Sequence, residues 1–145
     1  MLRTGCIYNG TPKEFGTRIS VMRKHTDDDG KAPDPKIIDG KSFQRWEPGL
    51  GAPGWLIAWW YKGNEQPGAN KLVRWQAFER DYRNYLRRKE VLEKARELGQ
   101  EALERDVVVL CKEELPKFCH RSILADVIRH EVPNLVVRHI IPEEG

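Results

Sequence analysis

The run "VVVL", from Val107 to Leu110, constrains the fold of this chain more than any other stretch. A strand with one face in water alternates apolar and polar residues, whereas an unbroken apolar run is typical of a strand that is covered on both faces. Such strands lie at the centre of parallel sheets. We therefore expect this run to be the central strand of a small, mostly parallel sheet flanked by helices.

The residues after this run favour a strand, helix, strand unit. Ile123, Leu124, Val127 and Ile128 recur at helical spacing, Pro133 ends the pattern, and "LVVRHII" follows as another strand. Two further strands are predicted nearer the start, at 5–8 and in the alternating "TRISVM", 17–22. The fold class we expect is α/β, a three-layer arrangement of Rossmann-like or flavodoxin-like type, as a single domain over residues 1–145.

The middle of the chain is predicted to be helical. "WLIAWWY", Trp55 to Tyr61, is long enough for about two helical turns. From Leu72 to Glu104 the apolar residues follow helical spacing, but the stripe loses register after Leu86, which predicts two helices or a bend near Arg88. The acidic, Gly- and Pro-punctuated stretch from Thr26 to Gly40 is typical of a surface loop.

Composition limits the functional classes. No apolar stretch approaches the roughly 18 residues of a membrane span, and "MLRTGCIYNGTPKEFG" lacks the apolar region of a signal peptide, so we expect no membrane association and a cytoplasmic protein. Three cysteines without short paired spacing indicate reduced thiols rather than a secreted disulfide framework. A net charge of +3 is a mild basic excess, weaker than that of a dedicated nucleic-acid domain.

The junction between the central strand and the next helix is the predicted site. In open α/β sheets, ligands bind beyond the carboxyl ends of the strands, and the unpaired N–H groups at a helix start favour an anion. Cys119, His120 and Arg121 stand at that helix start. We expect the site to bind a phosphate-bearing or otherwise anionic small molecule, with cysteine-dependent chemistry as a further prospect.

Each residue of the junction has a predicted role and an alternative. Cys119 is the candidate nucleophile, since the helix field and Arg121 would lower its pKa. Full burial of Cys119 would remove that argument. Glu113 and His120 are the acid and base candidates, and Glu113 is expected to contact Arg121, the anion clamp. The alternative is that the cysteines are buried apolar groups and that Arg121 is solvated.

Two more residues join the predicted anion site. Cys111 ends the apolar strand. The alternative to contact with the ligand is that its side chain is simply a small buried apolar group. Arg23, in "VMRKH", would converge with Arg121 on the anion if its strand runs parallel to the central one.

Known cysteine motifs do not fit the spacing. A cysteine-dependent phosphatase needs an arginine six positions after its cysteine, whereas Arg121 is ten positions after Cys111 and two after Cys119. Cys-x7-Cys-His is not the paired spacing of a zinc site. The acidic run "TDDD", Thr26 to Asp29, is better explained as a solvated loop. We expect no metal and no cofactor.

A non-catalytic module that binds nucleic acid or a protein is the alternative function. Arg80, Arg83 and Arg87 lie on one side of the long helical segment, where they could track phosphates, although interleaved acidic residues favour ordinary ion pairs. Among the tryptophans, Trp46 is the one that we consider for base stacking.

"VVLCKEELPKFCHRSILADVI" resembles the signature of the domain of unknown function 488 family. "RISVMR", "EPGLGAPG" and "FERDYRNYL" resemble further blocks of that family in the same order, so the likeness spans roughly residues 17–141. The resemblance implies an α/β fold with a pocket but no established reaction. The stretch "TDDDGKAPDPKIIDGK" departs from the family pattern. The matching positions are Arg23, Cys111, Glu113, Cys119, His120 and Arg121.

Overall fold

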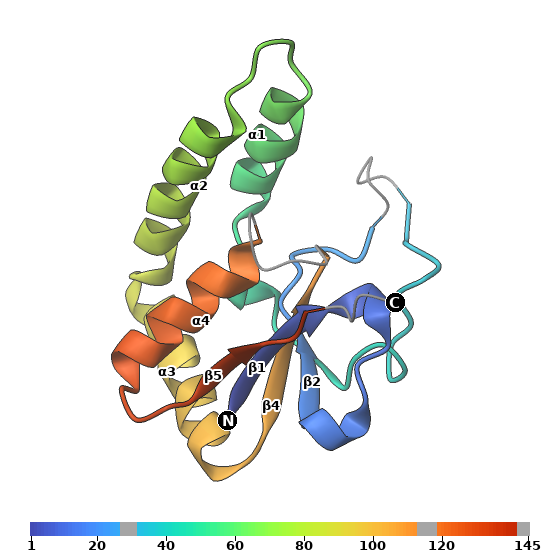
Figure 1. Ribbon diagram of the computed structural model, residues 1–145, viewed down its shortest axis with the longest axis vertical. Coiled ribbons are helices and arrows are strands. Elements are labelled where there is room, and N and C mark those ends of the chain that lie inside the picture. The colour runs from blue at the N-terminus through green and yellow to red at the C-terminus, as the bar shows by residue number, and fades with distance from the viewer. Residues whose placement is uncertain (27–31, 113–118, 142–145) are drawn as a thin grey trace.

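The computed structural model describes residues 1–26, 32–112 and 119–141. Within them the chain forms a parallel sheet with the strand order β3-β2-β4-β1-β5 (Figure 1). The strands, in chain order, are β1 (Leu2–Cys6), β2 (Thr17–Ser20), β3 (Arg45–Trp46), β4 (Val107–Cys111) and β5 (Val137–His139). Every residue of β4 is buried, which confirms that the apolar run is the centre of the sheet.

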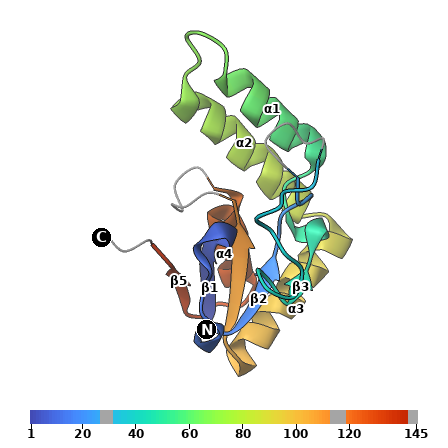
Figure 2. The same cartoon turned by 90° about the vertical axis from the view of Figure 1, so that its right-hand side faces the viewer.

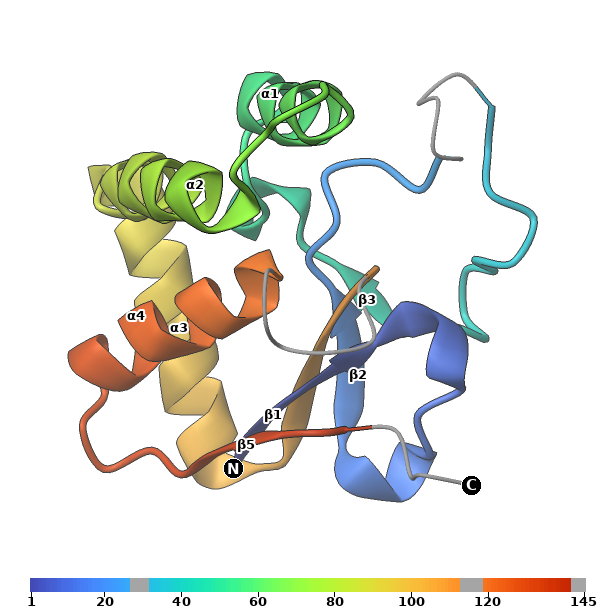
Figure 3. The same cartoon turned by 45° about the horizontal axis from the view of Figure 1, so that its top comes forward.

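The described residues contain the predicted helices and three short 3-10 turns. A pair formed by α1 (Gly54–Asn64) and α2 (Lys71–Leu86) extends away from the sheet (Figure 2). The remaining helices, α3 (Lys89–Glu104) and α4 (His120–Glu131), pack on one side of the sheet (Figure 3). The 3-10 turns are η1 (Ile7–Asn9), η2 (Lys13–Phe15) and η3 (Pro48–Leu50). None of the described helices is long and apolar enough to cross a bilayer.

The central strand supplies both faces of the sheet with apolar side chains. Val107 and Val109 belong to the large core cluster that they share with the helices. Val108 and Leu110 point the other way, into a smaller cluster with Ile7, Met22 and Phe43. Successive strand residues alternate between faces, so an unbroken apolar run fills two cores at once. The predicted three-layer α/β fold is therefore confirmed, with η1 and irregular segments forming the second covering layer.

Most predicted elements are present, with shifted ends. The predicted break near Arg88 is confirmed, since α2 ends at Leu86 and α3 begins at Lys89. The first strand was misplaced: it runs over Leu2–Cys6, not over 5–8, and Ile7 begins a 3-10 turn. Leu2 and the residues after it pair with β4 on one side and β5 on the other, and this long-range pairing decides the strand's position.

The turn before α1 is held close to the end of β2 by a glycine. A Cβ atom built on Gly51 would lie 2.1 Å from the carbonyl oxygen of Val21, a separation that no real side chain shows. The φ of Gly51 is −78°, which any residue adopts, so the requirement for glycine is steric. This contact fixes the "EPGLGAPG" turn against the strand that leads to Arg23.

We predict that Gly51→Ala destabilises the protein by about 1–3 kcal/mol, the usual effect of overpacking a filled space. The matched control is Gly54→Ala, because a Cβ there meets nothing within 4 Å. Its free energy of unfolding should stay unchanged or rise by up to about 1 kcal/mol through helix propensity. Urea unfolding of both variants tests this, and equal stability of the two would contradict the steric account.

Candidate functional site

Two cysteine thiols meet where β4 ends and α4 begins. Cys111 is the last residue of β4, and Cys119 is the N-cap residue of α4. Their sulfur atoms are 2.9 Å apart, and the Cys119 thiol donates a hydrogen bond to the Cys111 sulfur. Both side chains are buried, at 0% and 1% exposure respectively. The sequence therefore predicted the place of the site, and the fold brings the two thiols into direct contact there.

A third thiol lies at the same edge of the sheet. Cys6 ends β1, and its Cα pairs in register with that of Cys111 on the neighbouring parallel strand. Paired residues of adjacent strands point to the same face, so the two thiols share a side of the sheet. The Cys6 thiol donates a hydrogen bond to the carbonyl oxygen of Lys112, at 3.3 Å. Sequence reasoning missed Cys6, because only the strand register brings it to the junction.

His120 is the first residue of α4 and stands beside the thiol pair. Its Nδ1 atom is 3.8 Å from the Cys111 sulfur. The ring also packs against Tyr82 in a T-shaped arrangement, with ring centroids 5.8 Å apart. The Tyr82 hydroxyl donates to the carbonyl oxygen of Leu50 at 2.5 Å. Burial, together with the nearby charge of Cys111, raises the pKa of Tyr82 well above its usual value, so its phenol stays protonated as a donor.

Arg121 is fully buried, at 0% exposure, which rules out the alternative of a solvated residue at the helix start. Its Nη1 atom donates to the carbonyl oxygen of Gly5 at 2.9 Å. The guanidinium thus reaches from α4 to the backbone of β1. A buried guanidinium brings a permanent positive charge to the strand ends.

The ionisation of Cys111 reflects these neighbours. Burial alone would raise the pKa of the Cys111 thiol, because a buried charge loses its hydration. The hydrogen bond from Cys119 and the charge of His120 act in the opposite direction, and Arg121 adds to them. The three together hold the pKa of Cys111 well below its usual value. The lowered pKa and the role of hydrogen-bond acceptor both favour Cys111 as the thiolate of the pair.

The hydrogen bond between the two thiols counts against the role first predicted for Cys119. That prediction required a thiol of low pKa, whereas Cys119 is the hydrogen-bond donor of the pair, and at 1% exposure it is as buried as Cys111. Sequence reasoning assigned the thiolate to the helix start, where the field of α4 acts. The contact between the two sulfurs instead favours Cys111 for that role, and a nucleophilic role for Cys119 stays a prediction.

A family model described as "DUF488-N3a: Active DUF488-N3 subclade" matches residues 2–132. The chain belongs to this family. The resemblance to the domain of unknown function 488 family, inferred from the Cys-x-Glu and Cys-His-Arg blocks, is confirmed. No curated protein and no solved structure matches the chain.

In this DUF488-N3a protein, Arg23 has mainly backbone partners. Strands β2 and β4 are parallel, as the argument for Arg23 required. The guanidinium donates to the carbonyl oxygens of Gly51 and Ala52, at 2.9 and 3.3 Å, and to the Tyr85 hydroxyl at 3.0 Å. These bonds hold the η3 turn against α2. A contact between Arg23 and an anion stays a prediction.

The prediction of a contact between Glu113 and Arg121 lies outside the described residues, because Glu113 is not among them. The acidic loop residues Asp27 to Asp29 are also outside them. Among the described residues, no group of three or more His, Cys, Asp or Glu side chains is arranged to hold a metal ion.

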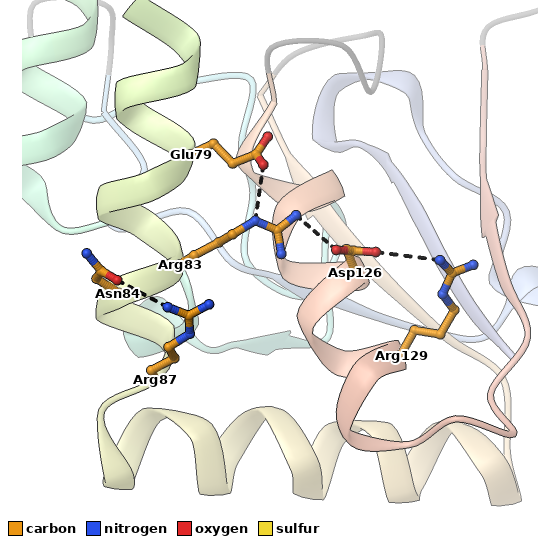
Figure 4. A network of polar contacts seen from close by, with 6 residues as sticks. All are labelled: Glu79, Arg83, Asn84, Arg87, Asp126 and Arg129. Atoms are coloured by element: carbon orange, nitrogen blue, oxygen red, sulfur yellow. Dashed lines mark hydrogen bonds and ion pairs between the residues drawn. The ribbon is translucent and has the colours of Figure 1, made fainter.

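In the basic stripe of Arg80, Arg83 and Arg87, Arg83 is engaged in ion pairs of the protein itself (Figure 4). Arg83 binds Glu79 at 3.1 Å and Asp126 of α4 at 2.9 Å. Asp126 also binds Arg129, at 3.5 Å. These partly exposed pairs are each worth about 0–1 kcal/mol, and they tie α2 to the helix that carries the site.

The other two members of the stripe also have protein partners. Arg80 binds Asp81 at 3.2 Å, and Arg87 donates to the Asn84 side chain at 3.4 Å. Neighbouring acidic and amide groups therefore occupy the arginines of this face, as expected for an ordinary solvated helix surface.

Trp46, considered for base stacking, is 45% exposed. Its ring packs on His25, with centroids 4.3 Å apart, and its Nε1 atom donates to the carbonyl oxygen of Met22 at 2.7 Å. One face of the ring therefore has a partner within the protein.

We predict that Cys111 titrates well below the ordinary thiol pKa of about 8.5. When the reduced protein is titrated, the ultraviolet absorbance of thiolate should show one transition well below that value. Cys111→Ala should abolish the transition and Cys6→Ala should leave it in place. A first transition at or above about 8.5 would contradict the assignment.

The same shift predicts how stability depends on pH. The pKa of Cys111 is lower in the folded than in the unfolded chain, so between the two values the unfolded state binds more protons. The stability that Cys111 contributes should be complete above about pH 8.5 and be lost as the pH falls through the folded pKa. Urea unfolding of wild type and Cys111→Ala across this range measures the difference, which should grow with rising pH.

Proposed function

We propose that this DUF488-N3a protein performs cysteine-dependent chemistry on an anionic small molecule, with Cys111 as the nucleophile. The observation that carries the proposal is the Cys111 sulfur itself, which receives a hydrogen bond from Cys119 and lies beside His120 and Arg121. A thiolate is the reactive form of cysteine, and surroundings that lower its pKa are typical of catalytic thiols.

A buried thiolate is costly unless nearby groups stabilise it. A cysteine with only a packing role is better kept as the neutral thiol, which behaves as a small apolar group. Here a hydrogen bond and two basic side chains surround the sulfur of Cys111. That arrangement favours a chemical role over the alternative in which the cysteines merely fill the core.

Proton transfer would fall to His120, with Cys119 as an orienting residue. In the proposed reaction, the Cys111 sulfur forms a bond to an electrophilic atom of the substrate, and the leaving group departs with the electrons of the bond that breaks. His120, whose Nδ1 is 3.8 Å from that sulfur, would supply a proton to the leaving group. Cys119 orients the nucleophile through its hydrogen bond. Glu113, the other predicted acid or base, keeps its proposed role.

Anion binding would rest on Arg121 and on the start of α4. The N–H groups at a helix N-terminus attract an anion, and the buried guanidinium of Arg121 adds a full positive charge at the same place. Arg23 is proposed as a second contact, at the end of β2. Because both thiols are buried, a substrate reaches Cys111 only after the side chains that cover it move.

The cytoplasm is the compartment that we propose, since three buried, reduced thiols suit a reducing environment. The alternative of a nucleic-acid-binding module gains no support from α2. Releasing Arg80 and Arg83 for phosphates would require breaking their ion pairs with Asp81, Glu79 and Asp126.

The proposal predicts that inorganic phosphate protects Cys111 from alkylation. Iodoacetamide labelling of the reduced protein, followed by mass spectrometry, should be about tenfold slower at Cys111 when phosphate is saturating. A tenfold change in rate corresponds to about 1.4 kcal/mol. Arg121→Lys should weaken this protection at least several-fold, because an ammonium cannot reproduce the planar fork of the guanidinium.

The matched control is Arg96→Lys, since Arg96, on α3, pairs with Glu131 at the end of α4 and lies outside the thiol cluster. That variant should be protected like the wild type. If phosphate, sulfate and acetate all leave the labelling rate of the wild type unchanged, the anion-binding part of the proposal is wrong.

A further inference from the structure

We propose that Cys111 and Cys119 form a peroxide-sensitive redox pair, which closes to an intramolecular disulfide when the protein meets hydrogen peroxide. This inference goes beyond the proposed function, because it requires no anionic substrate, although both use Cys111 as the attacking sulfur. It concerns a reversible modification of the site.

The geometry that carries the inference is the contact between the two sulfurs. They are 2.9 Å apart, whereas a disulfide bond is about 2.05 Å long. Side-chain adjustments of somewhat less than 1 Å in total would close the bond. Because Cys111 belongs to β4 and Cys119 to the start of α4, the bond would link the strand end directly to the helix.

The two sulfurs differ in a way that assigns a role to each. Cys111 is the acceptor of the hydrogen bond and has the lowered pKa, so it attacks the peroxide. Cys119 is the protonated donor already in contact with that sulfur, so it resolves the product. A low-pKa thiol poised next to a resolving thiol is the usual composition of a redox-sensing site.

The chemistry balances with peroxide as the oxidant. The Cys111 thiolate attacks one peroxide oxygen, the O–O bond breaks, and a sulfenic acid forms on Cys111 while hydroxide leaves and takes up a proton. The Cys119 sulfur then attacks the Cys111 sulfur, giving the disulfide and a water molecule. The two thiols lose two electrons in total, and the peroxide is reduced to two molecules of water.

Burial selects a small oxidant. Cys111 is 0% and Cys119 is 1% exposed, so a bulky disulfide such as oxidised glutathione cannot approach the sulfur in line without opening the structure. Hydrogen peroxide is only slightly larger than water and needs a far smaller opening. The positive charge of buried Arg121 also favours the hydroxide that leaves.

The test treats the fully reduced wild type with hydrogen peroxide, removes the excess with catalase, and then alkylates the unfolded chain. Before alkylation we expect the intact mass to fall by two hydrogens, and alkylation should then reach one cysteine of the three, Cys6. Peptide mapping should locate the bond between Cys111 and Cys119, and dithiothreitol should restore all three thiols. Oxidised glutathione at the same concentration should react at least about tenfold more slowly, because it requires the structure to open. A free-energy cost of about 1.4 kcal/mol for that opening corresponds to a factor of ten in rate.

Variants separate the roles. Cys6→Ser, which removes the third buried thiol, should form the bond as the wild type does. Cys119→Ser should instead gain oxygen at Cys111, and Cys111→Ser should leave Cys119 unoxidised. The wild-type mapping stands even if a serine variant fails to fold.

Three outcomes would overturn the inference: oxygen gained at Cys111 of the wild type without a bond, a bond that includes Cys6, or three thiols that remain open to alkylation. Equal rates with oxidised glutathione would overturn the choice of a small oxidant. The phosphate protection experiment contains no oxidant, so the proposed function and the redox pair can fail separately.

Discussion

The pairing of β4 between β1 and β2 is the interaction on which the rest of this structure depends. All five residues of β4 are buried, so their backbone N–H and C=O groups cannot reach water and must find partners in the protein. Parallel ladders on both sides supply those partners, and the bonds from Val107 N–H to Met1 and from Val21 N–H to Leu110 extend the pairing beyond the strand ends. The carboxyl ends of three strands are thereby brought together.

Helix α4 stands against this edge mainly through apolar burial. Ile123, Leu124 and Ile128 are at most 3% exposed, and each such side chain contributes about 1.5–3 kcal/mol on leaving water. The partly exposed pair of Arg83 with Asp126 adds at most about 1 kcal/mol. Packing therefore provides most of the stability of α4, while the ion pair adds a polar contact between α4 and α2. Both serve to place Cys119, His120 and Arg121 at the strand ends.

Sequence patterns predicted the elements that depend on local information. The apolar run gave the central strand, helical spacing gave α2 and α4, and loss of phase gave the break at Arg88. The strand-to-helix junction was also found in this way, since the Cys-His-Arg triplet is contiguous. The presence of Cys6 at the same edge was not predictable, because it depends on the register between β1 and β4.

The assignment of roles within the site also needed three-dimensional information. Which thiol is the acceptor depends on a 2.9 Å contact between residues on different elements. The full burial of Arg121 depends on the distant carbonyl group of Gly5. Likewise, the carbonyl partners of Arg23 come from a turn that begins some 25 residues later and follows no sequence period.

The register of β4 also determines where this protein tolerates changes in chain length. Side chains alternate between the faces of a strand, so deleting one residue of the apolar run would turn every later position to the opposite face. The thiol of Cys111 would then point into the core shared with Phe43, and Lys112 would take its place beside α4. Insertions and deletions can therefore accumulate in the irregular segments between elements, while the five residues of β4, which end at Cys111, must keep their number.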